Sequence, residues 1–523
     1  MVPLNDFQDH KGVGMLREKF LSILASRNTV YLILALLLVY VMARGIVGAR
    51  AKLLWFDEIQ TLVISNRPSV PLIWNTLARG FDVHPPTFYL IERFISKFIS
   101  AGEIGLRLPS ILSFIVILIC VFIYARRETD DRIALLAVLL LMSSSLFNTY
   151  LIEARPYCSA VACIAVGLVC FQQLPSTFWT ILFGLSLFLA VSFHYYAVFA
   201  AVPFGLAEVV FLIRTGKFRW YVWAALAMAA LPLIICWPLL SVAKTYYGNR
   251  IYSFARLTQF TECYKSYFLL GDSVYAVALL ILSTVAILVS RKQPKPFSQT
   301  SDHYPDWAHK SLLLGLLFLP LITLIVALLT RGPFLSRYTL PAILAIVLAF
   351  ARLLYSLHGR AIALAGVFVL SVVMARELRF WRYSGHDPLD HTLTTQRLGS
   401  LIQNSGHEDD LPVVISDGVL FGQLSFYSDR SWDNRLFWLA DADRELKYDG
   451  TDSMNKNMLG LREFLPHPEQ VRDYSEFTAS HESFLVYADD LKWVDQALIG
   501  DSALVQLVVA EGSHKLYFVR MNP

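Results

Sequence analysis

Long apolar runs alternate with short polar loops from residue 29 to about residue 380. A run of roughly 17–25 apolar residues can cross about 30 Å of hydrocarbon as a single helix. The first run is too long for a removed signal peptide, and no small-residue cleavage site follows it. The pattern therefore predicts about 11 membrane spans, which begin near Thr29, Pro109, Ile133, Tyr157, Phe178, Ala197, Trp220, Tyr275, Leu312, Thr339 and Ala361.

The pattern changes after residue 383. Segments 411–418, 483–493 and 503–520 are rich in β-branched or aromatic residues and carry Gly and Asp turn signals, which is typical of strands. A polar segment of helical character, 455–464, lies between them. The fold class predicted is a polytopic α-helical membrane protein, residues 1–383, with a C-terminal α/β domain, residues 384–523.

Composition and charge support this division. Of the 523 residues, 56% are hydrophobic and 16% are charged, whereas a soluble domain usually has about a quarter charged residues. A wholly soluble enzyme and a disordered chain are therefore excluded. Residues 384–523 hold 11 Lys and Arg against 23 Asp and Glu, while the remainder holds 34 against 18. The tail has no phosphate-binding motif that would support a nucleotide site, and its acidity argues against nucleic-acid partners.

The basic residues of short loops predict the orientation, because such loops stay on the cytoplasmic side. The N-terminus and the loops 126–127, 214–219, 291–295 and 358–360 fall on one side by this rule. The loop 50–106 and the acidic tail then lie outside the cytoplasm. The chain has no Asn-x-Ser/Thr sequon, and its six cysteines all lie in or near spans. We therefore expect a bacterial inner membrane, with the active site and tail on the periplasmic side and no disulfide scaffold or zinc site.

The loop after the first span contains the first candidate chemistry. Asp57 and Glu58 are adjacent acids in WFDE, close to a membrane exit. They could be merely solvated beside Trp55 and Phe56 at the headgroups, or one could be a general base acting on a hydroxyl. Pro68 and Pro71 divide the following apolar stretch into short segments along the interface.

His84 precedes two prolines, which hold it rigidly at the start of an amphipathic helix over 88–98. A lone histidine is usually structural, but one near an acid pair at the membrane surface suits contact with a phosphate.

Two further motifs reach the same outer face. In Glu153-Ala154-Arg155-Pro156-Tyr157, the arginine could snorkel while paired with the glutamate. Arg337 and Tyr338 follow several spans later. Arginine suits bidentate recognition of phosphate, so arginines converging at one face indicate an anionic headgroup. A transporter or a lipid-binding protein could show the same pattern.

Taken together, these four motifs resemble the GT-C membrane glycosyltransferases. The resemblance extends over about residues 29–380, and the nearest branch is the protein O-mannosyltransferase and lipid A aminoarabinose transferase superfamily, within it the bacterial lipopolysaccharide-core transferases. It implies transfer of a sugar, with inversion, from a polyprenyl-phosphate donor to a hydroxyl of a glycan, glycolipid or protein. The partners implied are that donor, its acceptor and membrane lipids. No metal motif is matched, so we expect no metal and no other cofactor.

The resemblance also assigns roles. Asp57 matches the acidic position of the family and would be the general base, with Glu58 orienting Asp57 or the acceptor. His84 would contact the donor phosphate, and Arg155 and Arg337 would neutralise it as it leaves.

Glu153 would position Arg155 or touch the sugar, and Tyr157 and Tyr338 would lie beside the substrate. The alternative function is a secondary transporter or flippase for an anionic lipid-linked substrate, and the third is an assembly protein without catalysis. A transporter would be expected to show internal repeats and helices broken at the membrane midplane, and the sequence shows no repeat.

Overall fold

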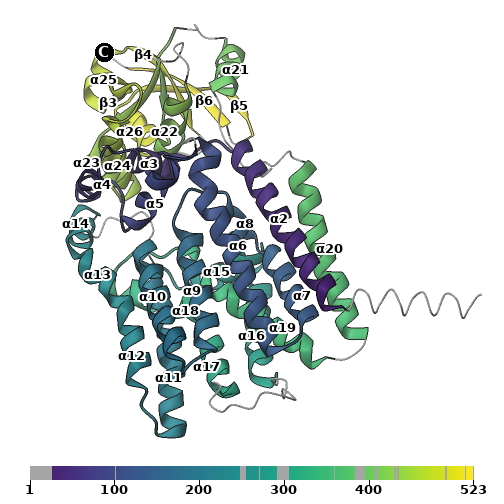
Figure 1. Cartoon of the computed structure of the whole chain (residues 1–523). Coiled ribbons are helices and arrows are strands. Elements are labelled where there is room, and N and C mark those ends of the chain that lie inside the picture. Colours follow the sequence, from purple (N-terminus) through teal and green to yellow (C-terminus); the bar gives the residue numbers. More distant parts are fainter. Residues whose placement is uncertain are drawn as a thin grey trace, which may run out of the picture.

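The computed structural model describes residues 26–521 apart from gaps at 100–101, 248–254, 270, 291–304, 358–359, 383–394, 407–409, 429–431, 433–434, 489–491 and 513. A bundle of long helices forms its larger part, and a mixed sheet with flanking helices lies beyond one end of the bundle (Figure 1). Three short helices, α3 to α5, lie between these two parts. The predicted domain boundary at 383/384, the predicted cytoplasmic loop 291–295 and the basic residues before residue 26 lie outside the described residues.

Each predicted apolar run coincides with helical structure. The bundle consists of α2 (Arg27–Ala51), α6 (Glu103–Glu128), α7 (Asp131–Met142), α8 (Ser145–Leu151), α9 (Tyr157–Phe171), α10 (Thr177–Phe193), η1 (Tyr195–Ala200), α11 (Ala201–Thr215), α12 (Trp220–Ala227), η2 (Met228–Ala230), α13 (Leu231–Ile235), α14 (Trp237–Tyr247), α15 (Gln259–Phe268), α16 (Ser273–Val289), α17 (Asp306–Leu317), α18 (Leu319–Thr330), η3 (Ser336–Thr339), α19 (Pro341–Ser356) and α20 (Arg360–Arg382). Ser26 caps α2 by accepting a hydrogen bond from the Thr29 N–H, and Asp130 caps α7 in the same way.

Within the described residues, three helical segments are long and apolar enough to cross a membrane: Arg27–Ala51, Glu103–Glu128 and Tyr195–Thr215. Four bent helix pairs raise this number to as many as seven if each pair is one span. Large apolar side chains such as Leu32, Leu36 and Val39 point outward from α2, as lipid-facing residues do. The helical membrane fold is confirmed, and the count of 11 stays a prediction.

The second span begins earlier than predicted. We expected it near Pro109, but α6 begins at Glu103 and includes Arg107. Both charged side chains have partners outside α6, because Glu103 accepts a hydrogen bond from Tyr427 and Arg107 pairs with Glu58. Polar residues can therefore precede the apolar run in one helix, and Pro109 lies inside that helix, in its second turn.

The interfacial helices follow the positions of the prolines. The helix α3 (Phe56–Ser65) ends before Pro68, α4 (Val70–Leu77) begins with Pro71 in its first turn, and α5 (Thr87–Ile95) follows His84-Pro85-Pro86. This confirms the predicted division of the loop into short segments. One side of α5 is buried through Phe88, Tyr89 and Glu92, as expected for an amphipathic helix.

The tail forms a sheet of six described strands in the order β3-β2-β1-β4-β6-β5. The first four positions are parallel, and β6 pairs antiparallel with both β4 and β5. The strands are β1 (Val413–Ile415), β2 (Leu436–Ala440), β3 (Val471–Asp473), β4 (Ser483–Ala488), β5 (Leu504–Glu511) and β6 (His514–Arg520). Four of them lie in the predicted segments, whereas β2 and β3 were not predicted.

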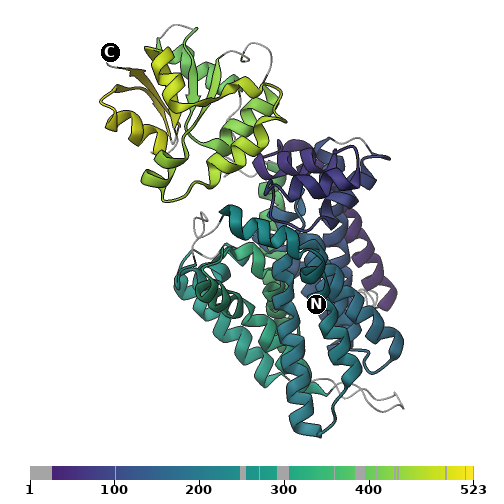
Figure 2. The same cartoon turned by 90° about the vertical axis from the view of Figure 1, so that its left-hand side faces the viewer.

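Helices cover both faces of this sheet. Those on the face towards the bundle contribute Leu398, Phe421 and Leu461 to a shared core, and those on the other face contribute Phe477 and Trp493 to a separate one. They are α21 (Thr395–Ser405), α22 (Gly418–Tyr427), α23 (Ala442–Asp449), α24 (Ser453–Arg462), η5 (Pro468–Gln470), α25 (Tyr474–Ser480) and α26 (Trp493–Gly500). Figure 2 shows the tail beyond the end of the bundle at which α3 to α5 lie.

Candidate active site

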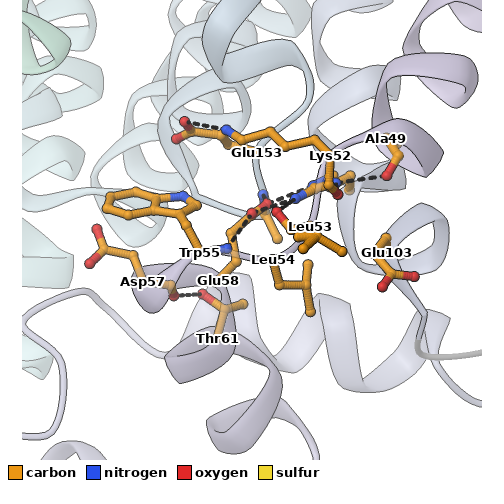
Figure 3. A network of polar contacts seen from close by, with 12 residues as sticks. Ala49, Lys52, Leu53, Leu54, Trp55, Asp57, Glu58, Thr61, Glu103 and Glu153 are labelled. Atoms are coloured by element: carbon orange, nitrogen blue, oxygen red, sulfur yellow. Dashed lines mark hydrogen bonds and ion pairs between the residues drawn. The ribbon is translucent and has the colours of Figure 1, made fainter. Parts of the chain in front are cut away.

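The two adjacent acids occupy the first turn of α3. Trp55 is the N-cap residue, and the Glu58 carboxylate accepts a hydrogen bond from the Trp55 backbone N–H at 3.3 Å. Consecutive helical residues are about 100° apart around the axis, so the two side chains point in different directions. Figure 3 shows the Asp57 carboxylate directed away from the polar network that surrounds Glu58.

Glu58 forms a closed ion pair with Arg107. The two carboxylate oxygens accept from Nε and Nη2 of Arg107 at 2.7 and 2.5 Å, and both side chains are 0% exposed. The remaining Arg107 N–H groups donate to the carbonyls of Ala49, Lys52 and Leu53. Glu58 also accepts from the Ala154 backbone N–H at 2.7 Å. The carboxylate therefore joins α3, α6 and the loop before α9 and holds the first turn of α3 in place.

Asp57 lies beside a second arginine. Its carboxylate is 3.7 Å from Nη2 of Arg155, and its side chain is 21% exposed. Arg155 is buried, and its Nη1 donates to the Asp57 carbonyl at 3.2 Å and to Oδ2 of Asp82 at 2.7 Å. Arg155 thus pairs with aspartates, so the alternative of a snorkelling arginine paired with Glu153 does not describe its contacts.

The buried carboxylate of Asp82 joins this arginine to His84. Nδ1 of His84 lies 2.7 Å from Oδ1 of Asp82 and 3.0 Å from Nη2 of Arg155, and the Tyr89 hydroxyl donates to Oδ2 at 2.7 Å. An ionised carboxylate only accepts, so we assign the Nδ1 proton of His84 to the bond with Asp82. The rigid Pro85-Pro86 step after His84 keeps the ring in this place.

Burial and charge act in opposite directions on these groups. Burial opposes ionisation of Asp82, but Arg155 and His84 outweigh it and hold the pKa of this carboxyl well below its usual range. For His84, burial dominates, and together with Arg155 it lowers the pKa despite the opposing charge of Asp82. At neutral pH, His84 is therefore neutral and Asp82 is ionised.

An aromatic group lies over the same cluster. The His84 ring is 5.1 Å from His194 and 5.8 Å from Tyr157, and the Tyr338 ring is 5.1 Å from His194. The Arg337 guanidinium lies 5.4 Å from the centre of the Tyr157 ring. Residues from the loop before α5, the start of α9, the end of α10 and η3 therefore meet at one place.

The Glu153 carboxylate forms its ion pair with a lysine rather than with Arg155 or Arg337. Its carboxylate pairs with Nζ of Lys52 at 3.3 Å, and within the described part of the chain its second oxygen is buried without a hydrogen-bond partner. Burial raises the pKa of this carboxyl, although Lys52 opposes the shift. The prediction that this carboxylate positions Arg155 is not seen in its contacts, because it turns towards Lys52. The alternative prediction, contact with the sugar, is untested.

The structure thus brings together most of the residues singled out from the sequence. Asp57, His84 and Arg155 share one polar cluster, and Tyr157, Arg337 and Tyr338 border it. Glu58 lies in the separate Arg107 network. The interfacial alternative for WFDE fails for Phe56, which is 2% exposed and packs against Gly422 of the tail.

Sequence reasoning missed Asp82, Arg107 and His194. Asp82 stands two residues before His84, and an acid at this spacing from a histidine is a signal that could have singled it out. Arg107 could not be found in this way, because its partner lies 49 residues earlier in the chain.

No group of three or more His, Cys, Asp or Glu side chains in the described part of the chain is arranged to hold a metal ion. The expectation that the protein uses no metal and no cofactor has not been tested and stays a prediction.

Part of the chain matches a known protein family. Residues 83–241 match the family described as dolichyl-phosphate-mannose-protein mannosyltransferase. This region includes His84, Arg155 and His194 but begins after Asp57. A search of curated proteins finds no match.

Solved structures give a fold match over nearly the whole chain. ArnT from Cupriavidus metallidurans bound to undecaprenyl phosphate is 15% identical, with a TM-score of 0.51, and the match covers 94% of this chain and 98% of that one. The apo form of the same protein gives 13% identity over the same shares, with a TM-score of 0.41. The Archaeoglobus fulgidus oligosaccharyltransferase gives 11% identity over 72% of this chain and 61% of that one, with a TM-score of 0.38. The family match over residues 83–241 and the fold shared with ArnT confirm the resemblance to the GT-C superfamily expected from the sequence.

Proposed function

We propose that the protein is an inverting glycosyltransferase that moves a sugar from a polyprenyl-phosphate donor to an acceptor hydroxyl at the extracytoplasmic face. The observation that carries this proposal is Asp57, a partly exposed carboxylate held beside the buried Arg155–Asp82–His84 cluster. The family match and the fold both support a transferase. The fold match to a protein bound to undecaprenyl phosphate supports a lipid-phosphate donor.

Asp57 is the group that activates the acceptor. A hydroxyl is a poor nucleophile at neutral pH, and a positioned carboxylate that takes its proton contributes about 10²–10⁴-fold. The hydroxyl oxygen then forms its bond to the anomeric carbon on the face opposite the phosphate, which inverts that carbon. Arg155 holds the Asp57 carboxylate and carbonyl in place, so its contacts support a positioning role in this step rather than the phosphate contact expected from the resemblance.

The leaving phosphate receives the electron pair of the broken C–O bond, so its negative charge grows in the transition state. His84 and Arg337 are the groups that meet this charge. Nδ1 of His84 is already bonded to Asp82, and Nε2 can donate to the phosphate only when the ring is protonated. The anionic phosphate itself favours that protonation, so donor binding and proton uptake by His84 are coupled.

The arrangement also supports the proposed location. The loop between α11 and α12 lies at the end of the bundle away from α3 to α5 (Figure 1). It holds Lys217 and Arg219, and Arg214 lies in the last turn of α11 just before it. Basic short loops remain in the cytoplasm, so the site and the tail face the periplasm in a bacterial inner membrane. Reporter fusions after Arg214 and after Pro523 should report opposite sides. Two cytoplasmic reporters would overturn this topology.

The function is tested with the purified full chain in lipid nanodiscs. Undecaprenyl-phosphate sugars of several types are supplied together with glycolipid and glycan acceptors from a bacterial envelope. The expected result is a mass increase of one sugar on an acceptor, with release of undecaprenyl phosphate. Movement of the lipid-linked sugar across proteoliposomes without any transfer would instead support a flippase.

Two variants test the contacts to the donor phosphate. His84→Ala and Arg337→Ala should raise the KM for the donor and also lower kcat while the protein stays folded, because the charge that both residues meet grows in the transition state. Unchanged donor kinetics in both variants would mean that His84 and Arg337 have structural roles and do not contact the donor phosphate.

A further inference from the structure

The tail has two hydrophobic cores, one on each face of its sheet. Side chains alternate along each strand, so Val413, Ile415 and Trp438 face one side while Val414 and Phe437 face the other. The core on the outer face is formed by tail residues alone. The core on the inner face continues through the short helices below it, and includes Leu54, Phe56, Ile59, Phe81, Tyr89 and Leu106.

The first contact of the inner face is with the segment just before Asp57. The Tyr427 hydroxyl accepts from the Leu54 N–H at 2.9 Å, and Gln423 donates to the Leu54 carbonyl at 3.1 Å. Both backbone polar groups of Leu54 are thus bonded to α22. A Cβ at Gly422 would stand 2.7 Å from the Phe56 ring, so this glycine allows the close approach of α22 to α3.

The second contact is with the segment just before Asp82. The Phe81 ring meets Phe464 edge to face at 5.4 Å, and a Cβ at Gly460 would lie 3.3 Å from the same ring. On its other side, the Phe81 carbonyl accepts a hydrogen bond from Gln60 of α3 at 3.2 Å. The tail therefore contacts the chain immediately before each aspartate that Arg155 binds.

We propose that the tail positions the active site: α22 and α24 fix the backbone at Leu54–Phe56 and at Phe81, and thereby set the distances between Asp57, Asp82 and Arg155. A carboxylate that must take a proton works only at hydrogen-bond distance, and a misplacement of about 1 Å can cost roughly 10²-fold in rate. The tail is then a part of the catalytic machinery at its inner face. This proposal rests on the proposed transferase function.

The test compares inner-face and outer-face variants of the full chain. Gly422→Ala should push Phe56 away and lower kcat by about 10- to 100-fold, with little change in the KM for the donor. The double variant Gly422→Ala/Phe56→Leu removes the steric conflict and should restore most of the activity. Phe477→Ala, a buried truncation in the outer core, should lower Tm yet keep kcat at temperatures below its unfolding transition. Gly399→Ala, where a Cβ meets only ordinary contact with Trp432, should leave kcat unchanged.

Hydrogen exchange supplies a readout that does not need activity. Gly422→Ala should speed amide exchange in residues 54–58, whereas Phe477→Ala should speed exchange only in the tail. Full kcat and unchanged exchange in Gly422→Ala would overturn the proposal, as would an equal loss of kcat in Phe477→Ala. If the wild-type chain transfers no sugar, the proposed function fails, and the exchange pattern still decides whether the tail fixes these segments.

Discussion

Arg107 and Arg155 hold the two adjacent acids of the WFDE stretch in different ways. Arg107 uses all five of its N–H donors, on Glu58 and on three backbone carbonyls, and no part of the pair meets solvent. Arg155 contacts two aspartates, but its Nε has no hydrogen-bond partner in the described part of the chain, and Asp57 stays partly exposed. A network whose hydrogen-bond donors are all used holds the structure in place. A network with an unused donor and a partly exposed carboxylate can also bind a substrate and react with it.

The largest effect on turnover is expected when the carboxylate proposed as the general base is removed. Asp57→Asn keeps the shape of the side chain but not its basicity, so turnover should fall by about 10²–10⁴-fold. The melting temperature should stay close to that of the wild type, because Asp57 lies 3.7 Å from Arg155 and is partly solvated. Single-turnover assays and thermal melts of the same preparation measure both. Near-normal turnover would exclude Asp57 as the base.

The next effect is one of stability. Glu58→Gln leaves the Arg107 charge buried without its partner, which typically costs about 3–5 kcal/mol. The denaturation midpoint should fall accordingly, and activity should be lost only as far as the protein unfolds. Glu463→Gln is the matched control, because Glu463 pairs with Arg79 in solvent, where the cost is about 0–1 kcal/mol. Equal midpoints for the two variants would mean that the Glu58 pair does not hold the structure together.

A smaller loss of kcat is expected when the two-pronged guanidinium of Arg155 is replaced. Arg155→Lys keeps the charge but cannot reach Asp57 and Asp82 with separate nitrogens. Looser placement of the Asp57 carboxylate should lower kcat roughly 10- to 100-fold, because a misplacement of about 1 Å can cost about 10²-fold. Steady-state kinetics at several donor concentrations test this. A change confined to the KM for the donor would assign Arg155 to the phosphate instead.

The smallest effect concerns pH. The pKa of His84 is lowered by burial and by Arg155 against the opposing charge of Asp82, and Asp57, His194 and Tyr157 also face the ring. Above this pKa, His84 of the free enzyme is therefore unprotonated, and the ring must take up a proton when the donor binds. The KM for the donor should rise by up to about tenfold per pH unit as pH increases. His84→Lys stays charged and should flatten this dependence, whereas an unchanged profile would show that His84 does not titrate with the donor.

The same histidine gives folding stability the opposite pH dependence: donor binding weakens as pH rises, whereas stability falls as pH falls. Its pKa in the folded protein lies below the unfolded value of 6.5, so the unfolded chain takes up a proton first as pH falls. Stability is therefore complete above pH 6.5 and declines as pH falls from 6.5 to the folded pKa. A series of melting temperatures across this range, in the wild type and in His84→Asn, isolates the contribution.

The helices and the meeting of Asp57, His84 and Arg155 could be predicted from the sequence, because apolar run length and a shared membrane face are local properties. The division of labour between Asp57 and Glu58 could not. It depends on Arg107 and Asp82, which reach the acids only through the tertiary structure.

The two unpredicted strands have a different cause. Leu436–Ala440 is a continuous apolar run, buried on both faces, which lacks the alternation that marks a strand with one exposed face. Val471–Asp473 is only three residues long and carries little pattern of its own.

The hydrogen bond from the Ala154 N–H to Glu58 also has a consequence for the order in which the site forms during synthesis. The two residues are 96 positions apart, so at 5–20 residues per second Glu58 is synthesised roughly 5–20 s before Ala154. During that interval α6, α7 and α8 are synthesised while the carboxylate lacks one of its partners. Arg155, which follows Ala154 directly, arrives at the same moment. The backbone partner of Glu58 and the arginine beside Asp57 are therefore supplied by two adjacent residues of one short loop.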